Sequence, residues 1–297
     1  MKKENKIKVI YITGSGRSGS TLLDRIISSA GECFSVGELK FLGDNLNMAD
    51  SLQKENKRFC DLSGKRLTES EFWKDIIEEI KRNDLKIFGR QGKDKFKLFF
   101  SLFSPKLSKG SKYDDKKILG LILRKAQEFK GKNVKVLVDS SKSLRRLIFL
   151  SRDDIDLYVV HLVRDPRGHI YSLRKKKKNF LYLFFRWLKL NCLISLYLKI
   201  FFPERKKLNI NYTSFVKDPE KYIEIINQKF GINISPDNYL EETNKDIDYT
   251  FAGNNMRGQE IKEIKLDDKW RIGMPGYQKI MLSVLAFIPN KIYGQKN

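Results

Sequence analysis

Three short runs of β-branched and other apolar residues stand out along the chain, at residues 8–12, 134–138 and 157–163. Near-continuous apolar runs of this length are typical of strands buried on both faces, as in a parallel sheet. Each run is followed by a segment of helical character, at residues 21–29, 143–150 and from Gly168 onward. This repeated strand–turn–helix order predicts an α/β fold in which a parallel sheet is flanked by helices.

The segment from about residue 43 to 130 differs from the rest because it is rich in lysine and mostly helical in pattern. Its clearest amphipathic helix is predicted over Ser70–Lys81, and Gly89–Lys117 has the basic composition of a loop. We interpret the segment as a helical and loop-like lid inserted into a single domain that spans residues 1–297.

The most apolar stretch is Phe180–Phe202, which follows four lysines at residues 175–178. Arg186, Lys189 and Lys199 interrupt it, whereas a transmembrane helix needs about 20 largely uncharged residues, so we do not expect a membrane span. Wound as a helix, the stretch is apolar nearly all round, which is typical of a buried helix or an interface. A second interpretation is that the lysines and this aromatic-rich helix bind an anionic membrane surface.

The composition narrows the classes of function. The 297 residues include 59 lysines and arginines against 36 acidic residues, and the net charge of +23 favours an anionic partner such as nucleic acid, acidic lipid or a phosphate-bearing ligand. Three scattered cysteines argue against a disulfide framework, and only two histidines, His161 and His169, argue against a metal centre, so we expect no metal. The first residues lack the apolar run of a signal peptide, which predicts a cytoplasmic protein.

The most informative motif is GSGRSGST at residues 14–21, directly after the first predicted strand. It matches the P-loop spacing G-x-x-x-x-G-x-[ST], in which glycines turn the backbone so that N–H groups at a helix start face one anion. Nucleotide-hydrolysing P-loops have a lysine before the final Ser or Thr, but this chain has Ser20 there and a cation at Arg17. Because a guanidinium binds two oxygens of one anion, the loop predicts a phosphate-like ligand held differently from that of a nucleotidase.

A second basic motif, RDPRGHIYS at residues 164–172, follows the third predicted strand. Pro166 can occupy the first turn of a helix, and Arg164 stands at the carboxyl end of the strand, where open α/β sheets bind ligands. Ser172 follows Arg164 by 8 residues (172 − 164), so the strand end and the helix can together bind a second phosphate.

These two motifs, with VDSSK at residues 138–142, resemble those of the sulfotransferase family, whose members use 3′-phosphoadenosine-5′-phosphosulfate (PAPS) as sulfuryl donor. Residues 211–219, 253–257 and 268–271 are also similar to segments of that family. The resemblance implies a P-loop-like α/β fold and the following donor contacts. They are Arg17, Ser18, Gly19, Ser20 and Thr21 for the 5′-phosphosulfate, in the loop that Gly14 opens, and Arg164, Ser172 and Arg257 for the 3′-phosphate.

Three residues are predicted to act in catalysis. In the family a Glu or His commonly activates the acceptor hydroxyl, and the resemblance implies Glu38 as this general base. We expect Arg17 to stabilise the transferring sulfuryl group and the leaving phosphate without a metal. Lys142, which ends the second strand region with Asp139, can contact the bridging oxygen or the acceptor, although a plain strand-end turn explains both residues as well.

Two other functions stay open on the sequence. A P-loop kinase or nucleotidase acting on a phosphorylated small molecule is suggested by residues 134–139, which resemble a magnesium-binding Walker B strand. Against it, Ser20 stands where the P-loop of such enzymes has its lysine. A non-enzymatic protein that binds nucleic acid or a membrane explains the charge but not the motifs around Arg17 and Arg164.

We favour a sulfotransferase whose partners are PAPS and a hydroxyl acceptor, with a peripheral contact to an anionic membrane as a further expectation and no nucleic acid. The basic, aromatic character of the lid and of the helix after residue 180 predicts a carbohydrate or glycan acceptor. Trp270 and Phe251 are aromatic residues that can stack on adenine, although packing explains them as well.

Overall fold

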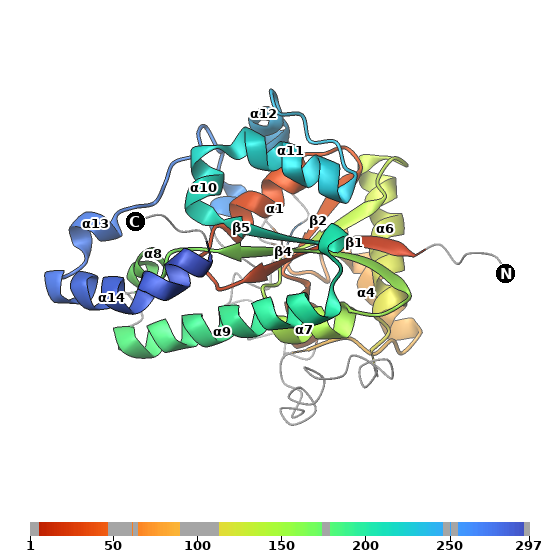
Figure 1. The fold of residues 1–297 in the computed structure, drawn as a ribbon. Helices are drawn as coiled ribbons and strands as arrows, with labels where there is room; N and C mark the ends of the chain where they lie inside the picture. Colours follow the sequence, from red (N-terminus) through yellow and green to blue (C-terminus); the bar gives the residue numbers. More distant parts are fainter. Residues whose placement is uncertain are drawn as a thin grey trace.

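The computed structural model describes residues 6–46, 61, 65–89, 113–173, 179–245, 250 and 255–293. A five-stranded sheet with the order β2-β3-β1-β4-β5 lies in the middle, and every paired strand in it is parallel (Figure 1). The strands are β1 (Ile7–Gly14), β2 (Cys33–Gly37), β3 (Val136–Asp139), β4 (Ile155–Val163) and β5 (Lys207–Asn211). The predicted parallel α/β fold is therefore confirmed, and the structure adds β2 and β5 to the three predicted strands.

Helices cover both faces of the sheet. Alternate side chains of β1 enter different cores, since Val9 and Tyr11 face one side while Ile10 and Ile12 face the other. The first core includes residues of α4 (Trp73–Arg82), α6 (Asp115–Lys130), α7 (Leu144–Leu150) and α9 (Phe180–Phe201). The second includes residues of α1 (Ser20–Ser28), α10 (Tyr212–Lys217), α11 (Pro219–Phe230) and α12 (Tyr239–Lys245). This burial on both faces explains why the central strands are continuously apolar.

The helices that follow the predicted strands begin close to where their sequences indicate. The first is α1, which begins at Ser20 directly after the loop. Ser143 caps α7 by accepting a hydrogen bond from the backbone of Arg146. In the same way Asp165 caps α8 (Pro166–Ser172), whose first residue is the proline that the sequence placed there.

The segment predicted to be a lid contributes helices to the core. The side chains of Trp73 and Ile80, on α4, pack with Ile118 and Ile122, on α6, in the first core. The structure also corrects the predicted loop, because α6 begins at Asp115 and makes residues 115–117 helical. Residues 47–60, 62–64 and 90–112 lie outside the described part of the chain, so the lid interpretation of the whole segment stays a prediction.

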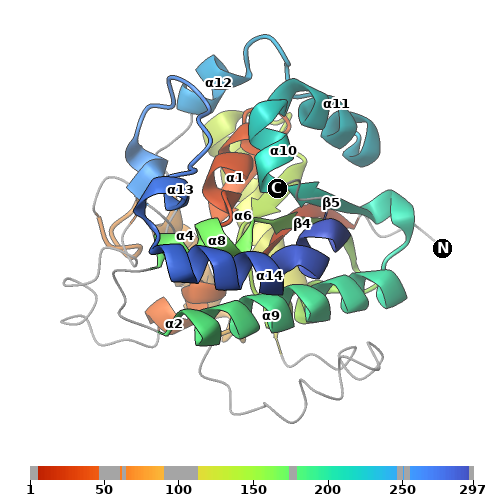
Figure 2. The same cartoon turned by 60° about the vertical axis from the view of Figure 1, so that its left-hand side comes forward.

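The helix α9 is a packed helix with an apolar outward side. Its residues Phe184 and Trp187 are buried with Leu282 of α14 (Gly276–Ile292), in a third core beside the sheet. By length and composition α9 is also a candidate membrane span, although 39% of its most apolar 18-residue stretch is buried inside the protein. Figure 2 shows α14 lying along α9 on this flank, with α13 (Trp270–Gly273) and α8 close to the start of α14.

Three short 3-10 helices and one α-helix complete the described chain. They are η1 (Leu39–Phe41), η5 (Glu204–Lys206), η6 (Asn255–Gly258) and α2 (Leu42–Leu46). Because all five strands are parallel, their carboxyl ends meet at one edge of the sheet, and the segments that follow β1, β2, β3 and β4 lie there together.

Candidate active site

The loop of residues 14–21, called the phosphate loop below, has a backbone that requires glycine at two positions. Gly14 has a φ of +139°, and a Cβ there would collide with the carbonyl oxygen of Leu162 on β4. Gly19 has a φ of +89°, and a Cβ there would lie 2.5 Å from the ring of Tyr212. The glycine spacing of the motif thus follows from close approach of β4 and α10 to the loop.

Arg17 also adopts the left-handed conformation, with a φ of +68°. Such a backbone is uncommon outside glycine and is strained, so the surrounding structure must hold it in place. One contact that does so is the hydrogen bond that Arg164 Nη1 donates to the carbonyl oxygen of Arg17, at 3.1 Å. The side chain of Arg17 is exposed, which leaves its guanidinium accessible to a ligand.

Two serine hydroxyls in the phosphate loop fit an anionic ligand. Ser15 and Ser18 are buried, and neither hydroxyl has a hydrogen-bond partner among the described residues. Buried polar groups are nearly always paired in proteins, so orphaned hydroxyls at a helix start indicate a ligand with oxygen acceptors. Ser20 and Thr21, the first residues of α1, are buried beside them. The residues present therefore fit a phosphate or phosphosulfate group.

Arg164 is held at the end of β4 by contacts that sequence reasoning did not find. Its Nη2 donates to the carbonyl oxygen of Asp267 at 2.6 Å and to the carboxylate Oδ2 at 2.9 Å. Its guanidinium also lies 4.9 Å from the centre of the Tyr212 ring. Arg164 is thus oriented beside the phosphate loop, and its guanidinium binds an acidic residue that lies 103 positions away in the sequence.

His169 lies against the phosphate loop as well, although no pattern in the sequence distinguishes it from a packing histidine. It is buried in α8 and hydrogen-bonds with the backbone of Gly16 in the phosphate loop. Burial, together with repulsion from Arg164, lowers the pKa of His169 to about 4. Ser172, at the end of the same helix, donates its hydroxyl to the carbonyl oxygen of His169 at 2.6 Å. To donate to a phosphate instead, Ser172 would have to give up this bond.

On the other side of β1, the predicted catalytic residues Glu38 and Lys142 form an ion pair. Lys142 Nζ lies 2.7 Å from Glu38 Oε1, and Lys40 Nζ lies 2.9 Å from Oε2; we call these three residues the Glu38–lysine cluster. Burial alone would raise the pKa of the Glu38 carboxyl, but attraction to both lysines outweighs it and lowers the pKa to about 2. Burial lowers the pKa of Lys142, and Glu38 opposes this effect.

Asp139, at the end of β3, has a structural role in this arrangement. Its carboxylate accepts a hydrogen bond from the backbone of Ser141 at 2.9 Å and lies 3.6 Å from Nε of the buried Arg146. Arg146 also pairs with Asp115 at the start of α6. The carboxylate that resembled a Walker B aspartate is therefore part of a buried ion-pair network that joins β3, α6 and α7.

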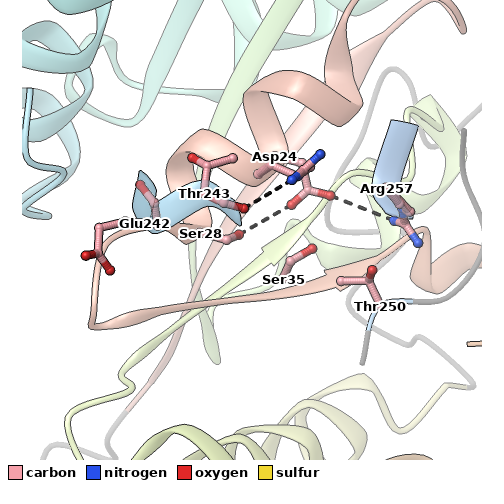
Figure 3. Close-up of a pocket in the computed structure, with 9 residues that line it drawn as sticks. Asp24, Ser28, Ser35, Glu242, Thr243, Thr250 and Arg257 are labelled. Atoms are coloured by element: carbon pink, nitrogen blue, oxygen red, sulfur yellow. Dashed lines mark hydrogen bonds and ion pairs between the residues drawn. The ribbon is translucent and has the colours of Figure 1, made fainter. Parts of the chain in front are cut away.

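The structure places Arg257 on the side of α1 that faces β2 and β3 (Figure 3). Its Nη2 lies 3.9 Å from Asp24 Oδ2, which also accepts a hydrogen bond from Ser140 at 2.6 Å. Asp24 and Arg257, together with Ser35 and Thr250, line a small pocket. The carboxylate that faces Arg257 is thus that of Asp24, beside the Glu38–lysine cluster. The contact of Arg257 with a 3′-phosphate stays a prediction.

Trp270, considered for adenine stacking, is engaged by two cations. Arg167 lies 4.4 Å and Arg271 lies 4.9 Å from its ring. Phe251 lies outside the described residues. No group of three or more His, Cys, Asp or Glu side chains within the described ranges is placed to hold a metal ion.

Comparison with known proteins identifies the family. The model of the sulfotransferase family matches residues 9–236, which include the phosphate loop, Glu38, Lys142, Arg164 and Ser172. The chain belongs to the sulfotransferase family. This membership confirms the resemblance drawn from the motifs, and it decides for an enzyme over a non-enzymatic binding protein and for sulfuryl transfer over a P-loop kinase.

Solved structures of sulfotransferases share the fold. The sulfotransferase domain of the Synechococcus PCC 7002 olefin synthase is 19% identical, with 96% of each chain covered and a TM-score of 0.52. The sulfotransferase domain from the curacin biosynthetic pathway is 20% identical, with 94% of this chain and 97% of that chain covered and a TM-score of 0.52. A search of curated proteins finds no significant match. Membership in the family implies PAPS as the donor for this sulfotransferase.

Proposed function

We propose that the enzyme transfers the sulfuryl group of PAPS to a hydroxyl group of a carbohydrate or glycan acceptor. The observation that carries the donor half of this proposal is the phosphate loop. There, buried hydroxyls that have no partner among the described residues, a glycine-dependent backbone and the exposed Arg17 meet at the start of α1. PAPS, when bound, supplies a sulfuryl group attached to an oxygen of its 5′-phosphate, and this phosphate is a good leaving group.

The chain's own residues then bind and orient the two anionic ends of the donor. Arg17, Ser18 and the backbone of residues 18–21 would hold the 5′-phosphosulfate, because the orphaned hydroxyl and the helix start both favour anionic oxygens there. Arg164, with Ser172, would hold the 3′-phosphate, with Arg257 as an additional contact. Binding through Arg164 requires that the phosphate replaces the carboxylate of Asp267.

The Glu38–lysine cluster supplies the acceptor chemistry. A carboxylate with a pKa of about 2 is a weak base, so Glu38 has to lose part of its attraction to lysine before it can take a proton from a hydroxyl group. Lys142 can provide this change: when its Nζ turns from Glu38 toward the donor's bridging oxygen, the pKa of Glu38 rises. The two predicted roles are thereby linked, since one movement places a cation on the leaving group and frees the base.

The choice of a saccharide acceptor rests on the basic and aromatic composition of the segment from about residue 43 to 130 and of the helix after residue 180. We expect an acceptor screen to give turnover with sugars or glycans that carry free hydroxyl groups. A screen in which only small phenols or other simple alcohols are sulfated would overturn the choice of acceptor and leave the donor site intact.

The donor site is tested by thermal-shift titration with adenosine 3′,5′-bisphosphate. A compound that binds the native state raises the melting temperature, and we expect Arg17→Ala and Arg164→Ala each to reduce this rise. Arg205→Ala is the matched control, because Arg205 is exposed next to the amino-terminal end of β5, at the opposite edge of the sheet. A parent protein that the bisphosphate does not stabilise would contradict the proposal.

A further inference from the structure

The outward sides of α9 and α14 form an apolar surface on one flank of the molecule, where the two helices lie side by side (Figure 2). Ile280, Val284 and Ile288 recur at every fourth position of α14, and Val284 and Ile288 are 72% and 67% exposed. On α9, Tyr182, Phe185 and Ile200 point outward in the same way, each more than half exposed. We call this the α9–α14 surface.

Exposed apolar residues are concentrated on this flank. Of the fourteen large apolar side chains that are exposed in the described part of the chain, twelve lie on α9, α13 or α14. Soluble monomers rarely expose continuous apolar areas larger than a few hundred Å² unless a partner or a membrane covers them. The grouping on adjacent helices therefore indicates a binding surface.

The charges on and near the α9–α14 surface indicate what kind of partner it binds. The sequence has no acidic residue between positions 166 and 203, nor between positions 269 and 297, in a chain with 36 acidic residues. The exposed polar positions of the two helices include Arg186, Lys189 and Lys199 on α9 and Lys291 on α14. A second copy of the chain would bring the same positive charges opposite them and be repelled. An exposed apolar surface whose charged residues are cations fits the headgroup region of an anionic bilayer.

The inner side of α9 requires it to lie along a membrane rather than cross it. Trp187 Nε1 donates to the carbonyl oxygen of Arg164 at 3.1 Å, and Asn191 Oδ1 lies 3.0 Å from Nε2 of the buried His161. These contacts hold the helix against β4, so only its outer side is available to lipid. We propose that the α9–α14 surface docks on an anionic lipid bilayer with both helices parallel to the membrane plane.

This orientation would keep the phosphate-binding motifs next to the bilayer. Arg167 of α8 donates to Ser283 Oγ of α14 at 3.0 Å, and Asn290 of α14 lies 3.4 Å from the carboxylate of Asp165. The membrane-facing helix is therefore connected directly to the segment that begins with Arg164. The proposal concerns binding to lipid and does not depend on the reaction that the enzyme catalyses.

Flotation of the full chain with lipid vesicles tests the proposal. We expect at least about tenfold more protein bound to phosphatidylcholine vesicles containing phosphatidylglycerol than to phosphatidylcholine alone, with a decrease at high salt. Val284→Glu combined with Ile288→Glu should reduce binding by about tenfold or more, because it puts two carboxylates at the lipid contact. Lys217→Gln combined with Lys221→Gln is the matched control, since it changes the net charge equally at exposed positions of α10 and α11.

A fluorescent probe on α9 locates the contact. Cys192 is an exposed free thiol on this helix, and Cys33 is buried, so an environment-sensitive dye can be placed on Cys192 after Cys60→Ser. Anionic vesicles should shift its emission to shorter wavelength. Flotation without such a shift would mean that lipid binds elsewhere and would overturn the proposal.

Other results would overturn it as well. One is equal vesicle binding by the parent and the glutamate variant. Another is a parent protein that is a dimer in light scattering while the glutamate variant is a monomer, because a second copy would then cover the surface. If the glutamate variant melts at a lower temperature, Val284→Ser with Ile288→Ser replaces it, and unchanged vesicle binding by that variant contradicts the proposal. Turnover in lipid-free solution, measured on the same variants, separates this test from that of the proposed function.

Discussion

The two halves of the site differ in how their polar groups are satisfied. In the phosphate loop, the buried hydroxyls of Ser15 and Ser18 have no partner among the described residues, and Arg17 presents an exposed guanidinium. In the Glu38–lysine cluster, on the other side of β1, the carboxylate is bound by Lys40 on one oxygen and by Lys142 on the other. The phosphate loop therefore has serine hydroxyls without partners among the described residues, whereas the charges of the Glu38–lysine cluster neutralise one another.

This difference suggests separate roles for the two halves, with ligand binding at the phosphate loop and proton transfer at the Glu38–lysine cluster. An anion can enter the phosphate loop without breaking existing hydrogen bonds to its serines, so the loop is prepared for a ligand. In our proposal the Glu38–lysine cluster has to exchange partners before its carboxylate can act as a base, so it would become active only when Lys142 moves away from Glu38. Substitutions in the two halves should consequently affect different quantities.

The largest effect is expected from Glu38→Gln. The amide keeps the shape of the side chain but cannot take a proton, so we expect kcat to fall by about 10²- to 10⁴-fold. The thermal shift caused by adenosine 3′,5′-bisphosphate should stay close to that of the parent, since this residue does not contact the donor in our proposal.

The matched control is Glu79→Gln, which removes the α4 carboxylate of an exposed ion pair with Arg124 of α6. It should leave kcat unchanged. Turnover by Glu38→Gln within about threefold of the parent would rule out a general base at this position.

The next largest effect is expected on stability at acid pH. The pKa values of His169, beside the phosphate loop, and of His161, in the sheet, are both lowered to about 4 by burial. Between pH 6.5 and 4 the unfolded chain binds a proton at each histidine and the folded chain does not, so the free energy of unfolding decreases as the pH falls. The decrease is about 3 kcal/mol for each histidine at pH 4.

The Glu38–lysine cluster should stay intact over that range. Because the pKa of Glu38 is about 2, its contribution to stability is complete above the ordinary pKa of 4.5 and is lost only as the pH falls toward 2. Urea unfolding at pH 7, 5.5 and 4 measures both effects, and His169→Gln should remove about half of the histidine-dependent loss. A free energy of unfolding that does not change between pH 6.5 and 4 would contradict the two lowered histidine pKa values.

A smaller effect is expected from Ser18→Ala. Loss of one hydrogen bond to the bound phosphate should weaken the affinity for adenosine 3′,5′-bisphosphate by up to about tenfold. The free energy of unfolding should not decrease, because the hydroxyl has no partner in the described structure. Calorimetric titration measures the first quantity and urea unfolding the second.

Ser29→Ala is the control for Ser18, because the Ser29 hydroxyl already donates to the carbonyl oxygen of Ile26 at 2.7 Å. Its affinity for the bisphosphate should equal that of the parent. If Ser18→Ala also binds like the parent, then the orphaned hydroxyl is not a ligand contact.

The smallest effect is expected from Asp267→Asn. The change removes a partly exposed carboxylate that competes with phosphate for Arg164, so the affinity for the bisphosphate should rise a few-fold. The gain should shrink at high salt because the interaction is electrostatic. Asp268→Asn, one residue along the chain and close to Arg271 instead, is the control. Weaker binding by Asp267→Asn would show that this carboxylate supports the site.

Much of the fold could be predicted because it rests on local patterns. The apolar runs that became β1, β3 and β4 are long enough to indicate buried strands, and the phosphate loop is continuous in sequence between a strand and a helix. The strands β2 and β5, CFSVG and KLNIN, were not predicted, because at most three of the five residues in each are apolar, whereas four of the five in the run at residues 134–138 are. Their place in the sheet depends on pairing with β3 and β4.

A loop of consecutive residues and a strand-end arginine need only local geometry to form, so the local pattern of the chain already predicts the phosphate loop and Arg164. Their surroundings depend on the fold, which brings Tyr212 against Gly19, Asp267 to Arg164 and two lysines to Glu38. Charges and rings from segments far apart in the chain meet at one edge of a parallel sheet, and their mutual distances set each pKa and each available donor. Sequence spacing does not contain those distances.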